Sequence, residues 1–365
     1  MAHRRYRIYR GLLWILIAII ATMTYIYTLR RHKNCAPPFS YAVQLRNFAN
    51  SSSGKFWNPG EVLRLGHEGL PFPVEDTGDL PTAHNTASTC KKRSKYIFFV
   101  NSTPGNFYRR AIMRSCLSNP IFSTYYRWTT VFFVGLSADS ATAKQVEEEA
   151  AQHGDVVVLP FQDSFTNRTF KFVYGMKWTI ENCPSTEYVV KLDDDMVVNV
   201  SMVMNYLRAH STSEKLECHC NVYKNALVVR DVKSKWYLSE KTYPKKMFPP
   251  YCAGGVGLFK SSALRGLYNA SFYLPFHPID DVYVTGDSSL IAGVKLIEIN
   301  KLVSFSGYDW SGVTSGKSML SQLYYPELSE LAWRIISESL TRKKRQKRKQ
   351  RRLIFRLPGT KMTNK

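Results

Sequence analysis

Strands and helices alternate between residues 95 and 192, and this alternation constrains the fold more than any other feature of the sequence. Four short segments rich in β-branched and aromatic residues are predicted as strands: KYIFFVN (95–101), TTVFFVGL (129–136), DVVVLP (155–160) and EYVVKL (187–192). The stretches between them have helical character: FYRRAIMRSCLSNP (107–120), SATAKQVEEEAAQH (140–153) and NRTFKFVYGMKWTIENC (167–183). Such alternation predicts an α/β fold, a mainly parallel sheet covered by helices on both faces.

Three consecutive aspartates, Asp193, Asp194 and Asp195, follow the fourth predicted strand. Ligands of such sheets bind beyond the carboxyl ends of the strands. Adjacent carboxylates repel one another unless a cation neutralises them, and hard oxygen ligands suit Mg²⁺ or Mn²⁺. The position therefore favours a site for a divalent cation and the phosphates of a nucleotide, with a structural acidic turn as the alternative.

A hydrophobic segment near the N-terminus predicts a membrane anchor. Residues 11–29 carry no charge and are just long enough to cross the hydrocarbon core of a bilayer. A buried core helix is the alternative, but the segment has no polar face, and it lacks the cleavage site of a signal peptide. The arginine-rich segment before it predicts a cytoplasmic tail over residues 1–10 and a lumenal location for the rest of the chain.

Acceptor sequons and cysteines agree with a lumenal location. Seven cysteines permit up to three disulfides, with one thiol left over, in an oxidising compartment. A metal site at Cys218-His219-Cys220 is a weak alternative, because the spacing lacks the paired CxxC units of a zinc site. The five sequons are at Asn50, Asn101, Asn167, Asn199 and Asn269.

Composition divides the chain outside the anchor into three parts. Residues 30–94 are rich in Ser, Pro, Gly and Asn and are predicted as a lumenal stem. Residues 95–338 form the predicted catalytic domain. Residues 339–365 form a basic tail, with nine Lys or Arg between residues 341 and 352, that is predicted to be solvated and disordered. The net charge of +22 alone would suggest a nucleic-acid partner, which the anchor and the sequons argue against.

An ordered set of motifs resembles the β-1,3-galactosyltransferase and β-1,3-N-acetylglucosaminyltransferase family, the Golgi hexosyltransferases of glycosyltransferase family 31. That family shares F-x-D-S/T-Y-x-N-L-T-x-K, then W-x-x-x-x-C, then K-x-D-D-D, and the chain has FQDSFTNRTFKFVYGMKWTIENCP (161–184) and YVVKLDDDMVVN (188–199). The similarity continues in RRAIMRSC (109–116), PPYCAGGVGLF (249–259) and HPIDDVYVTG (277–286). A lone DxD is a weak signal, whereas this ordered set is specific.

The resemblance implies a GT-A type, Rossmann-like nucleotide-sugar transferase domain in a single-pass type II protein of the Golgi apparatus membrane. The expected reaction moves Gal or GlcNAc from UDP-Gal or UDP-GlcNAc to an acceptor glycan on a glycoprotein or glycolipid, with inversion to a β1,3 link. Mn²⁺ or another divalent cation is the expected cofactor. The sequence leaves open the donor sugar, the acceptor and a homodimer.

Site residues follow from the resemblance by position. Asp193 is expected near the ribose, and Lys191 belongs to the same motif. Asp194, and above all Asp195, are expected at the metal and the diphosphate.

Two further pairs are expected around the donor. Arg110 and Arg114 are placed on the nucleotide side, where a guanidinium forks onto phosphate or carboxylate, with a simple helix surface as the alternative. Gly254 and Gly255 are expected to let the backbone approach the transferred sugar, with a simple turn as the alternative.

An inverting transfer needs a base that takes the proton of the acceptor hydroxyl. Asp281 is the favoured base, and Asp280 is expected to orient the site or cap the next helix. Leu117 and Cys116 stand where the family usually has Trp and Thr, and no histidine follows His277 to serve as a late metal ligand. A membrane-anchored, non-catalytic glycan-binding or scaffold relative is therefore the alternative function.

Overall fold

The computed structural model describes residue 90 and residues 94–211 and 216–354. The predicted cytoplasmic tail, the anchor over residues 11–29 and nearly all of the predicted stem lie outside the described residues. Among the helices that the structure describes, none combines the length and the apolar character needed to cross a bilayer.

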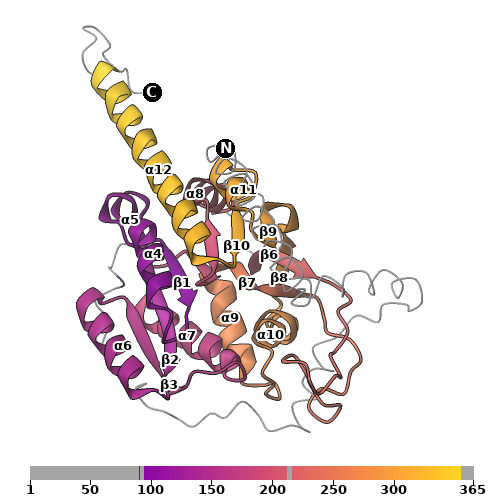
Figure 1. The fold of residues 1–365 in the computed structure, drawn as a ribbon. Helices are drawn as coiled ribbons and strands as arrows, with labels where there is room; N and C mark the ends of the chain where they lie inside the picture. Colours follow the sequence, from indigo (N-terminus) through magenta and orange to yellow (C-terminus); the bar gives the residue numbers. More distant parts are fainter. Residues whose placement is uncertain (1–89, 91–93, 212–215, 355–365) are drawn as a thin grey trace, which may run out of the picture. The chain divides into compact units, whose positions relative to one another are not determined.

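A seven-stranded mixed sheet forms the centre of the domain, in the order β3-β2-β1-β4-β7-β6-β8 (Figure 1). The four strands expected from the sequence form its parallel half, and β7 runs antiparallel to both β4 and β6. The strands are β1 (Tyr96–Asn101), β2 (Trp128–Leu136), β3 (Val156–Gln162), β4 (Tyr188–Asp193), β6 (Glu217–Tyr223), β7 (Tyr251–Lys260) and β8 (Lys295–Glu298). The sequence prediction of a mainly parallel α/β sheet is confirmed.

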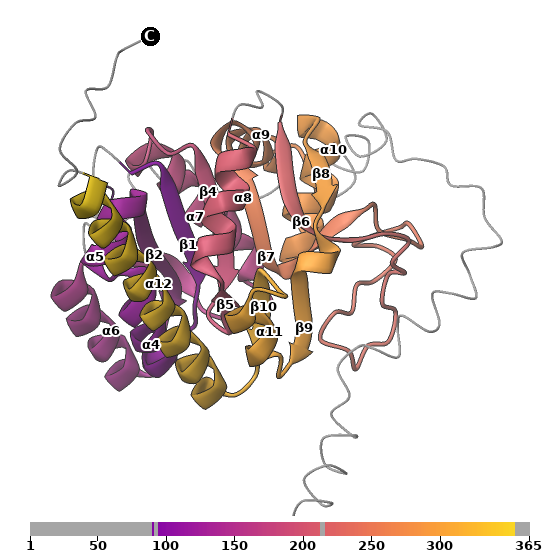
Figure 2. The same ribbon diagram turned by 90° about the horizontal axis from the view of Figure 1, so that it is seen from above.

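Helices cover both faces of this sheet, because its strands are apolar on both sides. In β1, Phe98 and Val100 join one buried cluster, whereas Ile97 and Phe99 join the other. The first cluster is completed by α4 (Phe107–Leu117), α5 (Pro120–Tyr126), α6 (Ser140–His153), α8 (Val200–Ala209) and α12 (Pro326–Ile354). The second is completed by α7 (Arg168–Asn182), α9 (Ser261–Ser271) and α10 (Ser288–Ala292), as Figure 2 shows from above.

A small second sheet supports the end of β4. It has the order β5-β10-β9 and consists of β5 (Met196–Val198), β9 (Val303–Gly307) and β10 (Leu320–Leu323). The backbone N–H of Leu323 donates to the carbonyl of Asp195 at 2.8 Å, just before β5 begins. A late segment of the chain therefore fixes the third aspartate of the triplet. The short η3 (Asn300–Leu302) leads from β8 into β9, and α11 (Trp310–Ser315) connects β9 to β10.

The connection between β6 and β7 has its own small core. It packs against the segment that leads into η2 (Val282–Asp287), a π-helix that begins directly after Asp281. The core consists of Val228, Leu238, Tyr243, Phe248, Ile279 and Val282. This packing positions the start of η2 and the two aspartates before it.

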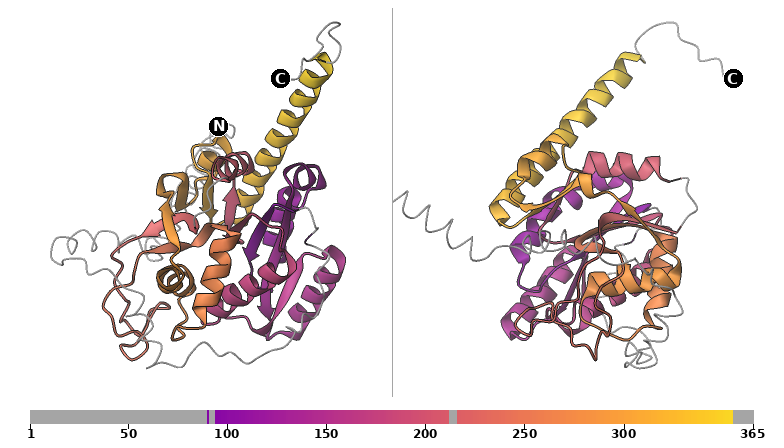
Figure 3. Two further views of the ribbon diagram at one scale, coloured as in Figure 1. Left: turned by 180° about the vertical axis from the view of Figure 1, so that it is seen from behind. Right: turned by 90° about the vertical axis from the view of Figure 1, so that its right-hand side faces the viewer.

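The predicted boundary between catalytic domain and basic tail, at residues 338 and 339, falls inside helix α12. The helix is continuous over 29 residues, and Trp333, Ile336 and Leu340 are buried. Their spacing of three and four residues places them on one face, which packs against α4. Figure 3 shows the later part of α12 extending beyond the sheet. The prediction of a disordered tail is therefore wrong for residues 339–354, and the packed domain reaches at least Leu340.

Truncating Leu340 is expected to destabilise the domain. Leu340→Ala removes a side chain that is 4% exposed and should lower the free energy of unfolding by about 2–5 kcal/mol. Arg345→Ala, on the exposed side of the same helix, should change it by less than about 0.5 kcal/mol. Urea unfolding followed by circular dichroism measures both, and equal effects of the two substitutions would contradict the assignment of Leu340 to the core.

Candidate active site

A cleft of about 720 Å³ lies at the carboxyl ends of β1, β2, β3 and β4. Ligands of α/β sheets bind at this edge. Its walls are the loops that follow these strands, with the aspartate triplet on one side. The lining residues that carry charge are Asp139, Asp163, Arg168, Lys171, Asp193, Asp194 and Asp195.

Asp193 is held by two cations. Lys191 Nζ lies 2.7 Å from one carboxylate oxygen and Arg168 Nη2 lies 3.1 Å from the other. Burial acts to raise the pKa of Asp193, but these two cations outweigh it and lower that pKa. Lys191 is itself buried and also donates to the carbonyl of Gly254. It therefore joins the end of β4 to β7.

Asp194 turns toward the loop between β1 and α4. One of its oxygens accepts hydrogen bonds from Ser102 Oγ at 2.7 Å and Asn106 Nδ2 at 2.8 Å. Burial raises the pKa of this carboxyl although these bonds oppose the change. These hydrogen bonds fix Asp194 on the side of the cleft that the β1–α4 loop forms.

Asp195 has an unused oxygen. Gln322 Nε2 donates to Oδ2 at 2.7 Å, whereas Oδ1 is buried and has no hydrogen-bond partner among the described residues. Burial, together with the Asp193 carboxylate, raises the pKa of Asp195 to about 6. A buried carboxylate oxygen without a donor is costly, and it is the ligand that a hard divalent cation prefers. Asp195, with Asp194 beside it, therefore fits the expected metal site.

Asp280 and Asp281 lie where η2 begins. Asp281 Oδ1 accepts a hydrogen bond from the N–H of Val282, and burial and the Asp280 carboxylate raise the pKa of Asp281 to about 7. Asp280 Oδ1 lies 3.6 Å from Arg168 Nε, and its other oxygen is buried and lacks a hydrogen-bond partner among the described residues. Arg168 thus links the carboxylates of the cleft with those of η2.

The two glycines of β7 have different neighbours. A Cβ on Gly254 would lie 3.2 Å from Asp281 Oδ2, so a side chain there would crowd this carboxylate. A Cβ on Gly255 would lie 3.0 Å from the Phe305 ring and 3.1 Å from Met196 Sδ, both in the small sheet. Gly254 therefore allows Asp281 to approach the backbone, and Gly255 allows the two sheets to pack together.

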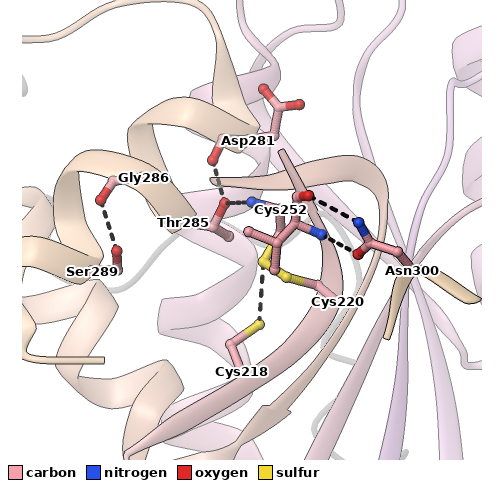
Figure 4. The surroundings of a disulfide bond; sticks show 9 residues. Cys218, Cys220, Cys252, Asp281, Thr285, Gly286, Ser289 and Asn300 are labelled. Atoms are coloured by element: carbon pink, nitrogen blue, oxygen red, sulfur yellow. Dashed lines mark hydrogen bonds between the residues drawn. A yellow bond between two sulfur atoms is a disulfide. The ribbon is translucent and has the colours of Figure 1, made fainter. Parts of the chain in front are cut away.

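A disulfide supports the strand that faces Asp281. Cys220 of β6 is bonded to Cys252 at the start of β7. The N–H of Cys252 donates to Thr285 Oγ1 at 2.9 Å, and that hydroxyl donates to the carbonyl of Asp281 at 2.5 Å (Figure 4). The disulfide is therefore connected to Asp281 through two hydrogen bonds.

The cysteine cluster is not a metal site. The sulfurs of Cys218, Cys220 and Cys252 lie within 4.8 Å of one another, but the Cys220–Cys252 disulfide leaves a single thiol. His219 Nδ1 forms a hydrogen bond with the hydroxyl of Tyr206 at 2.7 Å. The metal alternative for Cys218-His219-Cys220 therefore finds no support.

A second disulfide joins Cys90 to Cys183. The structure thus forms two of the three permitted bridges and leaves Cys116 and Cys218 as thiols among the described cysteines. Cys35 lies outside the described residues.

Arg110 and Arg114 do not line the cleft, contrary to the prediction. Arg110 is fully buried, and its guanidinium donates to Glu149 at 2.7 Å and to the carbonyl of Thr103 at 2.6 Å. Arg114 pairs with Glu149 at 2.6 Å and with Asp155 at 2.8 Å. Buried carboxylates occupy both guanidiniums, because a buried charge needs an opposite partner. Arg110 instead holds the loop that forms one wall of the cleft.

The other departures from the family pattern lie away from the cleft. Cys116 and Leu117 are fully buried in the core and are not among the residues that line the cleft. His277 is also buried, with Nε2 3.0 Å from Asp287. The side chain that contacts Asp195 from the late part of the chain is the amide of Gln322.

The described sequons differ in accessibility. Asn101 is buried at the end of β1, and Asn199 caps α8 while its amide donates to the carbonyl of Val313. The amide of Asn167 donates to the carbonyl of Gln162. Asn269 is exposed on α9, so it is the described sequon best placed to carry a glycan.

Sequence reasoning missed several side chains of the site. Arg168, Asp163 and Lys171 all lie in the quoted motif FQDSFTNRTFK, and Lys171 Nζ pairs with Asp163 at 2.5 Å. The motif was therefore the available signal for these three residues. The contacts of Ser102 and Gln322 with the triplet depend on tertiary packing and had no local signal.

The fold and the site define an α/β protein with an acidic cleft at the carboxyl ends of its parallel strands. The family model described as Galactosyltransferase matches residues 108–300, more than half of the chain. The chain belongs to this galactosyltransferase family.

Curated relatives agree with this assignment. The chain is 29% identical over 201 residues to beta-1,3-galactosyltransferase 1 of Mus musculus, which covers 55% of this chain and 62% of that protein. It is 30% identical over 155 residues to beta-1,3-galactosyltransferase 5 of Pan paniscus, covering 42% and 51%. It is 29% identical over 191 residues to the acetylgalactosaminyl-O-glycosyl-glycoprotein beta-1,3-N-acetylglucosaminyltransferase of Mus musculus, covering 51% and 49%. The matched segment thus spans half to three fifths of these relatives.

One solved structure, a glycosyltransferase involved in the glycosylation of the major capsid of PBCV-1, is 10% identical with a TM-score of 0.35. It covers 66% of this chain and 98% of that one, but so low a score does not establish a common fold.

The geometry of the cysteine cluster predicts a replacement disulfide. Cys218 Sγ lies 3.6 Å from Cys252 Sγ, and Cys218 shares a face of β6 with Cys220 because they are two residues apart. In Cys220→Ser, Cys252 should therefore bond to Cys218, whereas Cys218→Ser should keep the Cys220–Cys252 bond. Peptide mapping by mass spectrometry without reduction distinguishes the pairs. Free thiols at both Cys218 and Cys252 in Cys220→Ser would show that this exchange does not occur.

Proposed function

We propose that the protein is an inverting, UDP-sugar-dependent β-1,3-hexosyltransferase with a GT-A type domain. The observation that carries the proposal is the arrangement of two unlike carboxyl groups in a chain of the galactosyltransferase family. Asp195 presents a buried oxygen at the end of β4 that has no hydrogen-bond partner among the described residues, and Asp281 has a pKa raised to about 7 beside β7. The two carboxyl groups lie on different elements and have different hydrogen-bond partners, Gln322 for Asp195 and the N–H of Val282 for Asp281, which suits separate roles in one reaction.

The donor side is the cleft at the ends of β1 to β4. Asp193 is proposed near the ribose, and Asp194 and Asp195 would hold Mn²⁺ or another divalent cation next to the diphosphate. A cation held there would stabilise the negative charge of the leaving diphosphate as a Lewis acid. The amide of Gln322 would orient Asp195, because it occupies the other oxygen of this carboxylate.

Asp281 is proposed as the general base. A base works best when its pKa lies near the working pH, and burial and Asp280 bring the pKa of Asp281 to about 7. Its deprotonated carboxylate would take the proton of the acceptor hydroxyl as that oxygen attacks the sugar. Gly254 lets this carboxylate lie against β7. The neighbouring charge of Asp280 raises the pKa of Asp281.

Three exposed tyrosines, Tyr223, Tyr308 and Tyr324, support an acceptor glycan on the η2 side. Tyr223 ends β6 opposite Tyr251 of β7, and their rings are 5.7 Å apart. Tyr308 and Tyr324, whose rings are 5.9 Å apart, follow β9 and β10. Aromatic rings that are partly exposed offer an apolar face and a hydroxyl, which suits the two faces of a sugar.

The proposed cellular setting is the Golgi membrane. The two disulfides support an oxidising compartment, and the apolar segment over residues 11–29 supports a type II anchor in the Golgi membrane. UDP-Gal and UDP-GlcNAc are the proposed donors. The alternative, a non-catalytic glycan-binding relative, is less well supported because Asp195 and Asp281 are both present in distinct environments. A UDP-sugar panel with glycoprotein and glycolipid acceptors would identify the substrates.

Substitutions of Asp195 and Asp281 should affect different properties, ligand binding in the first case and the transfer rate in the second. Asp195→Ala should weaken binding of UDP and of Mn²⁺ together, because it removes the unpartnered oxygen. Asp281→Asn should leave UDP affinity unchanged and lower the transfer rate by roughly 10²-fold or more, the usual contribution of a general base. For each variant, calorimetric titration gives the UDP affinity with and without Mn²⁺, and a transfer assay gives the rate.

Asp231→Asn is the matched control, since this carboxylate is exposed in the β6–β7 connection and should affect neither quantity. Transfer at the parental rate by Asp281→Asn would exclude Asp281 as the base. Absence of transfer from every UDP-sugar by the parent would overturn the proposed activity.

The transfer rate should also depend on pH in a defined direction. Because the pKa of Asp281 is raised to about 7, the base is protonated below that pH, and the rate should rise with pH and level off above it. Asp280→Asn removes the neighbouring charge that helps to raise this pKa, so the midpoint should shift to lower pH. Rates measured from pH 5 to pH 9 would contradict this role if the midpoint stayed in place or moved upward.

A further inference from the structure

Arg168 occupies a position where the quoted family motif has leucine. In F-x-D-S/T-Y-x-N-L-T-x-K, the leucine aligns with the arginine of FQDSFTNRTFK. Arg168 is the first residue of α7, and its side chain lines the cleft. This chain therefore places a cation at the donor site where the motif has an apolar residue.

The guanidinium of Arg168 is held in place by Asp193 but does not use all of its hydrogen-bond donors among the described residues. Nη2 donates to Asp193 Oδ2 at 3.1 Å, and Nε lies 3.6 Å from Asp280 Oδ1, beyond hydrogen-bond distance. The guanidinium carbon lies 5.5 Å from the centre of the Phe165 ring, which also lines the cleft. A guanidinium has five N–H donors, and among the described residues Arg168 uses one in a hydrogen bond. The side chain is 32% exposed, so its other donors remain available to a ligand.

Two lysines near Arg168 already have partners. Lys171 is bonded to Asp163 and to the carbonyl of Ser102, and its side chain is 5% exposed. Lys191, 2% exposed, is bonded to Asp193 and Gly254. Arg168 is therefore the cation of the described cleft lining that can take a new partner.

Arg109 lies outside the cleft lining. Its guanidinium donates to the carbonyls of Leu323 and Tyr324. Arg109 therefore does not replace Arg168 as a cation in the cleft lining.

The charge balance of the site makes such a cation useful to an anionic ligand. Six carboxylates surround Arg168, Lys171 and Lys191: Asp163, Asp193, Asp194, Asp195, Asp280 and Asp281. A diphosphate that enters this field is repelled unless cations meet its oxygens. A guanidinium matches phosphate geometry with two parallel N–H donors, which leucine lacks entirely.

We infer that Arg168 binds the diphosphate of the donor directly, an inference that rests on the proposed transferase function. The guanidinium stays paired with Asp193 and turns its remaining donors to a phosphate oxygen, exchanging the longer contact with Asp280. This contact would be separate from the contact that a divalent cation, held by Asp194 and Asp195, makes with the diphosphate. Part of the affinity for UDP is therefore independent of the cation. Uridine without phosphates gains nothing from it.

The test compares UDP and uridine binding in Arg168→Leu. Calorimetric titrations are run on the full chain in buffer with Mn²⁺ and in buffer with EDTA. The Kd for UDP should rise about 10-fold or more in both buffers, the scale of one or two charge-assisted hydrogen bonds, while the Kd for uridine stays unchanged. Arg168→Lys, which keeps the charge without the fork, should lie between the parent and Arg168→Leu.

Arg265→Leu is the matched control, since Arg265 is exposed on α9 away from the cleft lining, and it should bind UDP like the parent. Parental UDP affinity in Arg168→Leu would overturn the inference and leave the proposed function standing. Equal losses of UDP and uridine affinity would also overturn it, because Arg168 would then support the pocket rather than the phosphates. A parent chain that binds neither ligand in either buffer would instead overturn the proposed function.

Discussion

Repulsion among the carboxylates at the end of β4 is the constraint on which the rest of the site depends. Asp193, Asp194 and Asp195 follow one another directly, and each is stabilised by a different part of the chain. Lys191 from the same strand and α7 hold the first, the loop after β1 holds the second, and Gln322 of β10 holds one oxygen of the third. Segments more than a hundred residues apart must therefore be in place before the triplet is stable.

The described residues do not fully neutralise the acidic cluster. Oxygens of Asp195 and Asp280 are buried without a hydrogen-bond partner among the described residues. Burial also raises the pKa values of Asp195 and Asp281. Buried carboxylates without partners lower the stability of a folded domain. They are typical of functional sites, where a ligand or a reaction uses them. The unpaired oxygens thus mark where donor and acceptor chemistry are expected to meet.

The sequence predicted the features that arise from local patterns. Apolar strands followed by helices predicted the parallel half of the sheet, and the position of the triplet after β4 predicted the edge where the cleft lies. The role of Arg110 was not predictable, because its partner Glu149 lies 39 residues away on α6 and nothing local indicates their pairing. Helix α12 was missed because its charged segment resembles a solvated tail, whereas Trp333 and Leu340 fix the helix through packing.

The position of α12 has a consequence for synthesis of the chain. This helix completes the core beneath α4, which was made more than two hundred residues earlier, and β10 just before it contributes Gln322 to the triplet. The cover of the first half of the domain thus comes late in the sequence. While translation continues, the parallel strands carry an apolar face that lacks this cover, and such a face is prone to aggregation. Folding of the nascent domain is therefore expected to depend on chaperones until α12 has left the ribosome.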